Sequence, residues 1–257
     1  MVATDANGCT VASNMVAVSE PVAVTAGTSV SSYNGFNVSC VGASDGYIEV
    51  VASGGTGNYT FTLGGTSSAV QTQPGGTYRF NGLVSGGYTV NVEDANGCGM
   101  ASVLNITLTA PTSVIVSASV TGGYNGSDVS CFGAGDGEVT ATASGGDGSY
   151  GYKLNEMPGN VTGDVSGVYT GLPAGGYTVT VTDGNGCSTT TASVTVDNPP
   201  AVGASLTGTD ISCNGSGDGT VMAIGTGGTG AFSYDLEDGL GAPVANTGGD
   251  ATGSYTG

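Results

Sequence analysis

Cysteine is the reactive side chain that recurs most regularly in this sequence. The pentapeptide DANGC at residues 5–9 returns at 94–98, and DGNGC follows at 183–187, so that Cys9, Cys98 and Cys187 are spaced at intervals of 89 residues. An acid and a thiol at such a spacing could belong to a metal site, a catalytic loop or a disulfide-closed turn. These three alternatives predict different classes of protein.

Composition excludes several classes of partner and chemistry. Lys and Arg together number 2 against 20 Asp and Glu, and the formal net charge is −18. Nucleic acid and anionic membranes are therefore not expected partners, because both are bound through clustered cations. The sequence has no His, which removes the usual general base and the commonest zinc ligand.

The composition also indicates where the protein is found. No apolar run approaches the roughly 20 residues that a membrane-spanning helix needs, so we expect no membrane insertion. Six cysteines in a chain rich in Thr, Ser, Asn and Gly favour an oxidising compartment. We predict an extracellular or cell-surface protein.

Three further motifs accompany each pentapeptide in a constant order, which indicates a tandem array of one domain. The first is VSCVGASDG at 38–46, repeated as VSCFGAGDG at 129–137 and ISCNGSGDG at 211–219; the others are ASGGTGNYTF at 52–61 and NGLVSGGYTV at 81–90, with their counterparts. Proline marks the boundaries between repeats. We expect the late strands of one repeat in 1–20, complete repeats in 21–110 and 111–199, and the first part of a further repeat in 200–257.

Each repeat is predicted to be built of β-strands alone. The segments 47–52 and 138–143 alternate β-branched residues with other types, and YTVNVED and YTVTVTD alternate apolar with polar residues. About seven short strands per repeat are typical of an immunoglobulin-like sandwich. We predict an all-β chain of tandem immunoglobulin-like repeats, each of about 80–90 residues, forming a rod or fibre.

The pentapeptide itself is predicted to be a hairpin turn, because it lies between two strands. Asn-Gly supplies the positive φ angles of a tight primed turn, and the preceding Asp accepts backbone N–H groups. The residues assigned to this role are Asp94, Asn96, Gly97, Asp183, Asn185 and Gly186. Upstream, the pattern GLxxGGY is typical of a tyrosine corner, with Tyr88 and Tyr177 in the corner position.

As a set, SCxGxxDG, SGGxGxY and GLxxGGYTVxVxDxNGC resemble the SprB repeat of giant surface proteins in gliding bacteria of the Bacteroidetes type. The resemblance covers two whole repeats and parts of two more. It implies an extracellular adhesin or surface filament that is exported by a type IX route and attached at the outer membrane. Because such modules occur in many large secreted proteins, gliding motility does not follow from the motif alone.

The cysteines leave two pairing schemes open. In the first, each repeat closes its own disulfide, Cys40 with Cys98 and Cys131 with Cys187, which would stabilise a repeat by about 4 kcal/mol through chain entropy. The second joins Cys98 to Cys131 and Cys187 to Cys213, and so ties neighbouring repeats together. We expect the first scheme, because every repeat is then self-sufficient, with Cys9 and Cys213 paired to cysteines beyond this sequence.

No residue is assigned to a metal, a cofactor or catalysis. The cysteines lack the CxxC spacing of a zinc site, and the acids of DANG lack the distal Glu of a calcium loop. Calcium at junctions between repeats is the remaining alternative. Glu49 and Glu138 could suggest a glycosidase pair, but Glu49 aligns with Thr140 and Glu138 with Tyr47, so they are not the same position. We therefore expect no enzyme.

The leading hypothesis is a non-enzymatic extracellular adhesin or stalk, part of a large surface filament used in attachment or gliding. Its expected partners are neighbouring repeats or protomers, surface polysaccharide and solid substrata. The alternative is a filament subunit that polymerises head to tail by strand exchange, with residues 1–20 completing the repeat at 200–257 of another copy.

Overall fold

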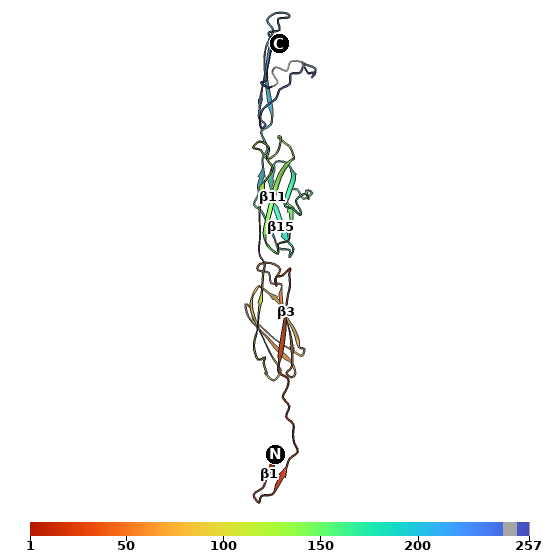
Figure 1. Cartoon of the computed structure of the whole chain (residues 1–257), viewed down its shortest axis with the longest axis vertical. Coiled ribbons are helices and arrows are strands. Elements are labelled where there is room, and N and C mark those ends of the chain that lie inside the picture. The colour runs from red at the N-terminus through yellow and green to blue at the C-terminus, as the bar shows by residue number, and fades with distance from the viewer. Residues whose placement is uncertain (244–250, 257) are drawn as a thin grey trace. The chain divides into compact units, whose positions relative to one another are not determined.

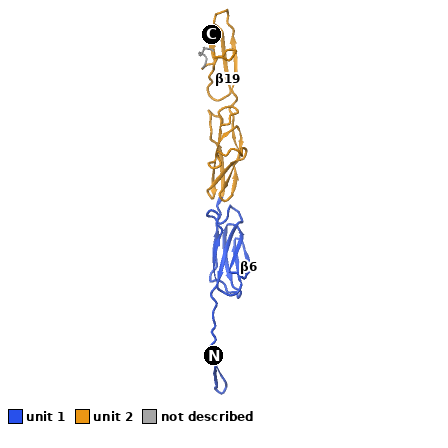
Figure 2. Cartoon of the chain, turned by 90° about the vertical axis from the view of Figure 1, so that its right-hand side faces the viewer, with its two compact units in different colours: residues 1–112 blue, residues 113–257 orange. Residues whose placement is uncertain are grey.

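The computed structural model describes residues 1–243 and 251–256, and the regular elements in them are β-strands. This confirms the predicted all-β fold. Within the described residues, no helix is long and apolar enough to cross a membrane. The chain divides into two compact units, Met1–Thr112 and Ser113–Gly257 (Figure 2). Each unit contains one complete sandwich, and β3 and β11 mark the two sandwiches in Figure 1.

The first complete repeat is an antiparallel sandwich of two sheets. One sheet has the strand order β3-β4-β7 and the other β6-β5-β8-β9. The strands are β3 (Thr25–Val30), β4 (Gly46–Ser53), β5 (Tyr59–Gly65), β6 (Ala69–Gln73), β7 (Thr77–Leu83), β8 (Gly86–Glu93) and β9 (Leu104–Leu108).

Alternation along the strands creates the core of this sandwich. In β4 the side chains of Ile48 and Val50 are fully buried, whereas Glu49 and Val51, which alternate with them, point to the other face. Strand β8 alternates in the same way, and both strands contribute to one cluster with Phe61 of β5. Successive side chains of a strand point to opposite faces, so the period-2 pattern of the sequence determines which residues meet in the core.

The second complete repeat, in 112–196, has a similar arrangement, but its strands form three sheets instead of two. Its sheets have the orders β10-β11-β13, β12-β15-β16 and β14-β17. The strands are β10 (Thr112–Val120), β11 (Gly137–Gly146), β12 (Tyr150–Leu154), β13 (Val168–Leu172), β14 (Gly175–Tyr177), β15 (Val179–Asp183), β16 (Ser188–Thr190) and β17 (Val194–Val196). Its core is a separate cluster.

The strand registers of the two repeats correspond residue by residue. Ile48 is opposite Phe80 in the first repeat, and Val139 is opposite Tyr169 in the second. Each pair is preceded by the same irregularity, after Gly46 or Gly137. A Cβ at Gly46 would lie 2.8 Å from the carbonyl oxygen of Leu83, so the close approach of the two strands requires glycine there.

The two repeats differ where the first has strand β6. In the second repeat, residues 155–167 form turns instead of a strand. The side chain of Tyr169 donates a hydrogen bond of 2.9 Å to Asp164 Oδ1 in this segment. Thr178 donates from its backbone N and its Oγ1 to the carboxylate of Glu156, at 2.7 and 2.8 Å. Side-chain bonds thus attach the turn segment to the sandwich where the first repeat uses a strand ladder.

Two smaller sheets complete the described residues. Strands β1 (Val2–Thr4) and β2 (Thr10–Ala12) form a hairpin around the first DANGC. Strands β18 (Gly203–Thr209), β19 (Thr220–Thr226) and β20 (Ser254–Thr256) form the three-stranded sheet β18-β19-β20, which corresponds to β3-β4-β7. The sequence-based boundaries 1–20, 21–110, 111–199 and 200–257 remain predictions, and residues 244–250 and 257 of the last lie outside the described part.

Candidate binding surface

Each sandwich has two distinct ends, which we name the hairpin end and the corner end. At the hairpin end of the first repeat, the turn that begins at Asp94 follows β8, and Thr56 donates from its backbone N to Asp94 Oδ2 at 2.9 Å. At the corner end, Tyr88 at the start of β8 donates from its hydroxyl to the carbonyl oxygen of Val84, also at 2.9 Å. Strand β8 runs the length of the sandwich between the two ends.

The hairpin turn is organised by the side chain of its aspartate. Asp94 Oδ1 accepts the backbone N–H groups of Asn96 and Cys98, both at 2.9 Å. Asp183 Oδ1 accepts those of Asn185 and Cys187, at 3.0 and 2.8 Å. Hydrogen bonds from Cys98 and other backbone groups hold the pKa of Asp94 below its usual value. The carboxylate therefore accepts hydrogen bonds from backbone N–H groups that have no backbone partner in the tight turn.

The turn is not the primed turn that the sequence predicted. Gly97 and Gly186 have positive φ angles of 78° and 88°, but Asn96 and Asn185 are not among the residues with positive φ. The N–H of Gly97 donates to the carbonyl oxygen of Asp94 at 3.0 Å. The asparagine thus keeps an ordinary backbone conformation and glycine alone takes the left-handed one, as in a hairpin with a glycine bulge.

The two tyrosines assigned to the corner make equivalent contacts. Tyr177 donates from its hydroxyl to the carbonyl oxygen of Pro173 at 2.7 Å, four residues before it, as Tyr88 does to Val84. Both rings are almost fully buried. Burial raises the pKa of Tyr177. These contacts are those of a structural corner, with the hydroxyl satisfied by the backbone.

The structure contradicts the predicted pairing of cysteines within a repeat. Cys98 and Cys131 are free and exposed, whereas Cys40 and Cys187 are disulfide-bonded. Neither Cys40–Cys98 nor Cys131–Cys187 is formed, and the alternative pairs Cys98–Cys131 and Cys187–Cys213 are not formed either. The reason is that the two cysteines of a repeat lie at opposite ends of its sandwich. Cys9 and Cys213 are also free in this chain, so their predicted partners beyond it remain a prediction.

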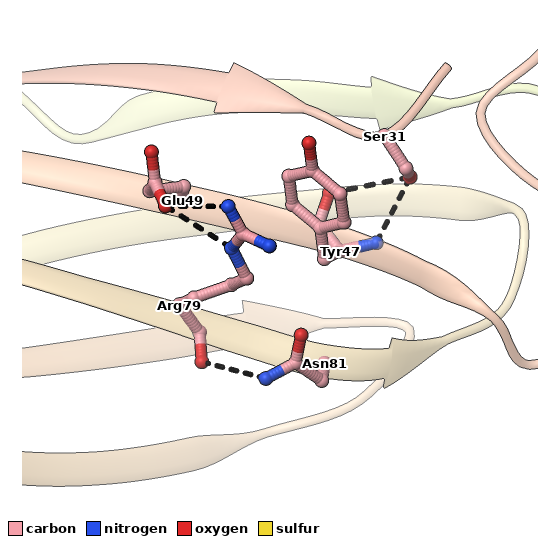
Figure 3. Close-up of polar contacts among 5 residues, drawn as sticks. All are labelled: Ser31, Tyr47, Glu49, Arg79 and Asn81. Atoms are coloured by element: carbon pink, nitrogen blue, oxygen red, sulfur yellow. Dashed lines mark hydrogen bonds and ion pairs between the residues drawn. The ribbon is translucent and has the colours of Figure 1, made fainter.

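A polar cluster on the outer face of the β3-β4-β7 sheet is the candidate binding surface. Arg79 of β7 donates from Nε and Nη2 to Glu49 Oε2 of β4, at 3.0 and 2.8 Å. Its guanidinium carbon lies 4.0 Å from the ring centroid of Tyr47, which places the cation over an aromatic face. Figure 3 shows these side chains with Asn81, whose Nδ2 donates to the carbonyl oxygen of Arg79 at 3.3 Å.

Ser31 fixes the base of this cluster. Its hydroxyl accepts the backbone N–H of Tyr47 at 2.9 Å (Figure 3). The same hydroxyl donates to the carbonyl oxygen of Asn37 at 2.6 Å. The side chain of Arg79 is 46% exposed and that of Glu49 is 30% exposed. Glu49 takes two of the five N–H donors of the guanidinium. The cluster therefore presents a positioned cation, an aromatic ring and amide groups on an open face.

The sequence did not single out this cluster as a site. Tyr47 and Arg79 are 32 residues apart, and only the register that places Glu49 opposite Arg79 brings them together. The scarcity of cations was the available signal, since Arg79 and Lys153 are the only two. In the described residues, no group of three or more Cys, Asp or Glu side chains could hold a metal ion.

The SprB repeat family model matches the chain at residues 36–66, 123–158 and 205–241. Three segments of the chain are therefore similar to the SprB repeat. Each match includes one Ser-Cys motif and the strand that follows it, β4, β11 or β19. No curated protein sequence matches the chain.

Solved structures that resemble the chain do so at low identity. A C-terminal fragment of intimin in complex with its translocated receptor is 16% identical, with a TM-score of 0.38 over 72% of this chain and 66% of that one. Fibronectin(III)-like modules of CbhA from Clostridium thermocellum are 18% identical (TM-score 0.31; 66% of this chain, 93% of that one). A tetra-tandem repeat from the extending region of a large adhesion protein is 19% identical (TM-score 0.22; 90% and 65%).

Proposed function

We propose that this chain is part of a non-enzymatic extracellular adhesin, a stalk of tandem SprB repeats within a large cell-surface filament. The observation that supports this function is the repetition itself. Two consecutive sandwiches share the register of their sheets, their aspartate-organised turns and their tyrosine corners. A scaffold repeated in this way provides length and copy number, whereas an enzyme concentrates its chemistry in one pocket.

The finer parts of this proposal are type IX export, attachment at the outer membrane and a role in gliding. The resemblance of the motif set to the repeats of gliding bacteria supports all three. The acidic, lysine-poor composition supports exposure to the medium, since a net charge of −18 keeps many copies soluble.

For the adhesive contact we favour surface polysaccharide bound at the Tyr47–Arg79 cluster. The guanidinium and the Asn81 amide offer hydrogen bonds to hydroxyl groups on an open face, and the ring of Tyr47 backs the cation. Affinity electrophoresis of the whole chain through gels containing polysaccharide tests this contact. Arg79→Ala should abolish the retardation, whereas Lys153→Ala, the matched removal of the other cation, should leave it unchanged. Equal retardation of both variants would exclude the cluster as the contact.

Live imaging tests the proposed function. An antibody against this region would be applied to unfixed cells of the source organism, followed by time-lapse microscopy. Label on the cell surface that travels along the cell body supports a gliding adhesin. Stationary surface label supports an adhesive stalk without motility. Label confined to the cell interior would exclude an extracellular adhesin of either kind.

The alternative is a filament subunit that polymerises by strand exchange, and one observation favours it. Among the residues that the structure describes, no second sheet pairs with or covers the β18-β19-β20 sheet, and Leu206 on its inner face is 71% exposed. Strands from another copy could cover such a face. Denaturing electrophoresis of cell-surface protein separates the two proposals. A single product far larger than this chain supports one long stalk, and a ladder of bands in steps of the 24.6 kDa mass supports a polymer.

A further inference from the structure

The two cysteines of a repeat belong to two different loops at opposite ends of the sandwich. We call Cys40, Cys131 and Cys213 the SC cysteines, and Cys9, Cys98 and Cys187 the NGC cysteines. Ser39 next to Cys40 donates its backbone N–H to Asp45 Oδ1 at 3.1 Å, just before β4 begins. Ser130 donates to Asp136 and Ser212 to Asp218 in the same way, at 3.0 and 2.9 Å. The SC cysteines thus occupy equivalent loops.

These loops lie at the corner end. Asn37 and Val38 both donate their N–H groups to the carbonyl oxygen of Thr109, which directly follows β9. The NGC cysteines lie at the hairpin end, where the N–H of Asp94 donates to the carbonyl oxygen of Cys98 and that of Asp183 to Cys187. Strands of eight residues separate the two ends, a length of roughly 20 Å or more. A disulfide needs its two Cβ atoms within about 4 Å, so a folded repeat cannot join its own cysteines.

The bonding state of the cysteines agrees with this geometry. Cys40 is disulfide-bonded while Cys98 of the same repeat is free. In the second repeat Cys187 is bonded while Cys131 is free. One SC cysteine and one NGC cysteine are therefore bonded, and neither has its partner in its own repeat.

The direction of the chain indicates which repeat supplies the partner. In the first repeat β3 begins at the hairpin end, where Thr25 is opposite Ser53, and β9 finishes at the corner end, where Leu108 is opposite Gly86. In the second repeat, Asp197 after the last strand accepts the N–H of Asp128 at the corner end. The chain therefore leaves a repeat beside its SC cysteine and starts the next beside an NGC cysteine.

We propose that the disulfides of this array join repeats to one another, with the SC cysteine of each repeat bonded to the NGC cysteine of the repeat that follows it. The two thiols lose two protons and two electrons to a disulfide donor, which is reduced to two thiols. A thiolate of one cysteine attacks the donor, and the thiolate of the other displaces the donor's remaining half. Consecutive repeats are then connected twice, by the peptide chain and by a disulfide.

Peptide mapping of the whole chain tests the proposal. The chain is oxidised in a buffer of oxidised and reduced glutathione, its remaining thiols are alkylated, and it is digested with chymotrypsin without reductant. We expect the peptides that contain Cys40 and Cys187 to be linked, because Cys187 is the NGC cysteine of the repeat that follows the one with Cys40. A link of Cys40 to Cys98, of Cys131 to Cys187, of Cys98 to Cys131, of Cys187 to Cys213, or between two cysteines of the same type would overturn the proposal.

Two serine variants of the first repeat provide a matched comparison. Cys40→Ser should release one NGC thiol of another repeat for alkylation and leave the labelling of Cys98 unchanged. Cys98→Ser should leave the disulfides of the chain as they were. New alkylation of Cys98 in the first variant, or a lost disulfide in the second, would contradict the assignment.

Reduction supplies a readout that does not depend on either variant folding. Because no sandwich contains an internal disulfide on this assignment, reductant should leave the unfolding transitions of both complete repeats in place. Disappearance of either transition on reduction would indicate a bond within that repeat and overturn the proposal. This inference is independent of adhesion, since it would hold in a filament that binds nothing.

Discussion

The two complete repeats share their interiors and differ on their outer faces. Ile48 and Phe80 in the first repeat occupy the positions of Val139 and Tyr169 in the second, and all four are buried. On the opposite face of the same strands, Glu49 and Arg79 correspond to Thr140 and Val168. The strand register thus determines which residues pack in the core, whereas the residue type at the exposed positions can vary between repeats.

The polar contacts of the two faces follow from this difference. In the first repeat, Arg79 forms an ion pair with Glu49 and a cation–π contact with Tyr47. In the second repeat, the hydroxyl of Thr121 donates to Glu138 Oε1 at 2.6 Å and lies 2.9 Å from Thr140 Oγ1. Exposed positions contribute little to stability, so they can differ between repeats at small cost. The comparison separates positions that specify the sandwich from positions that give one repeat its own surface.

The largest effect is expected in the shared core. Phe80→Ala should lower the stability of the first repeat by about 3–5 kcal/mol, because it removes a buried ring. This ring packs edge-on against that of Tyr78, with 4.8 Å between the two ring centroids. Calorimetry of the whole chain should show one transition moved to lower temperature and the transition of the second repeat unmoved. Val51→Ala, at a half-exposed position of the same sheet, is the control and should change little. A shift of both transitions would show that the repeats do not unfold separately.

Acid should weaken a contact that the repeats share. Hydrogen bonds from Ser130 lower the pKa of Asp136, and those from Ser212 and Ser216 lower that of Asp218 to about 2. In Asp45, burial opposes the shift but the bonds from Ser39 lower the pKa nonetheless. An unfolded aspartate has a pKa of about 3.9, so this stabilisation is fully present above that pH and is lost as the pH falls through the folded pKa.

The melting temperature measured between pH 5 and pH 2 checks this expectation. It should fall by several degrees across that range. Asp136→Asn should reduce the acid dependence of the second repeat, because the replaced group no longer titrates. Asp210→Asn, at an exposed acid, is the matched control, and an equal change in both variants would contradict the assignment.

A smaller loss of stability is expected from a substitution that affects the second repeat alone. Tyr169→Phe removes the hydroxyl bonded to Asp164, where the first repeat already has Phe80, and should destabilise the second repeat by about 1 kcal/mol. Burial and the bond to Asp164 raise the pKa of Tyr169, as expected of a hydroxyl held in its protonated form. Urea unfolding followed by tyrosine fluorescence measures the change. An unchanged midpoint would mean that the 155–167 turns are held without this bond.

The smallest effect on stability is expected at the exposed ion pair. Arg79→Ala should cost at most about 1 kcal/mol, because both partners are partly exposed and solvent screens their attraction. Transfer of the pair by Thr140→Glu with Val168→Arg should change the second repeat by as little. A thermal-melt shift of many degrees in either variant would show that this surface is part of the fold.

Much of the fold could be predicted from the sequence, because repetition and period-2 alternation are both visible along the chain. The segments 47–52 and 138–143 lie within β4 and β11, and the predicted immunoglobulin-like sandwich is the one observed. The turn geometry was less accessible, since the sequence Asn-Gly does not show which of its residues takes a positive φ. The segment 155–167 had no counterpart from which its turns could be inferred.

The cysteine pairing failed for a physical reason. Spacing along the chain shows that two cysteines belong to one repeat, but not that Cys40 and Cys98 lie at opposite ends of it. That placement depends on the direction in which β4 and β8 cross the sandwich. The Tyr47–Arg79 cluster escaped prediction for a related reason, because contacts across strands depend on register, which a single sequence leaves unstated.

The positions of Arg79 and Lys153 give each complete repeat its own protease-sensitive bond. Trypsin cleaves after these two residues, and they lie within paired strands, β7 opposite β4 and β12 opposite β15. A protease requires a locally opened chain, so each bond becomes cleavable when its own repeat opens. The rate of tryptic cleavage after each residue therefore reports how often its own repeat opens. A filament of such modules would resist trypsin-like enzymes for as long as its sandwiches stay closed.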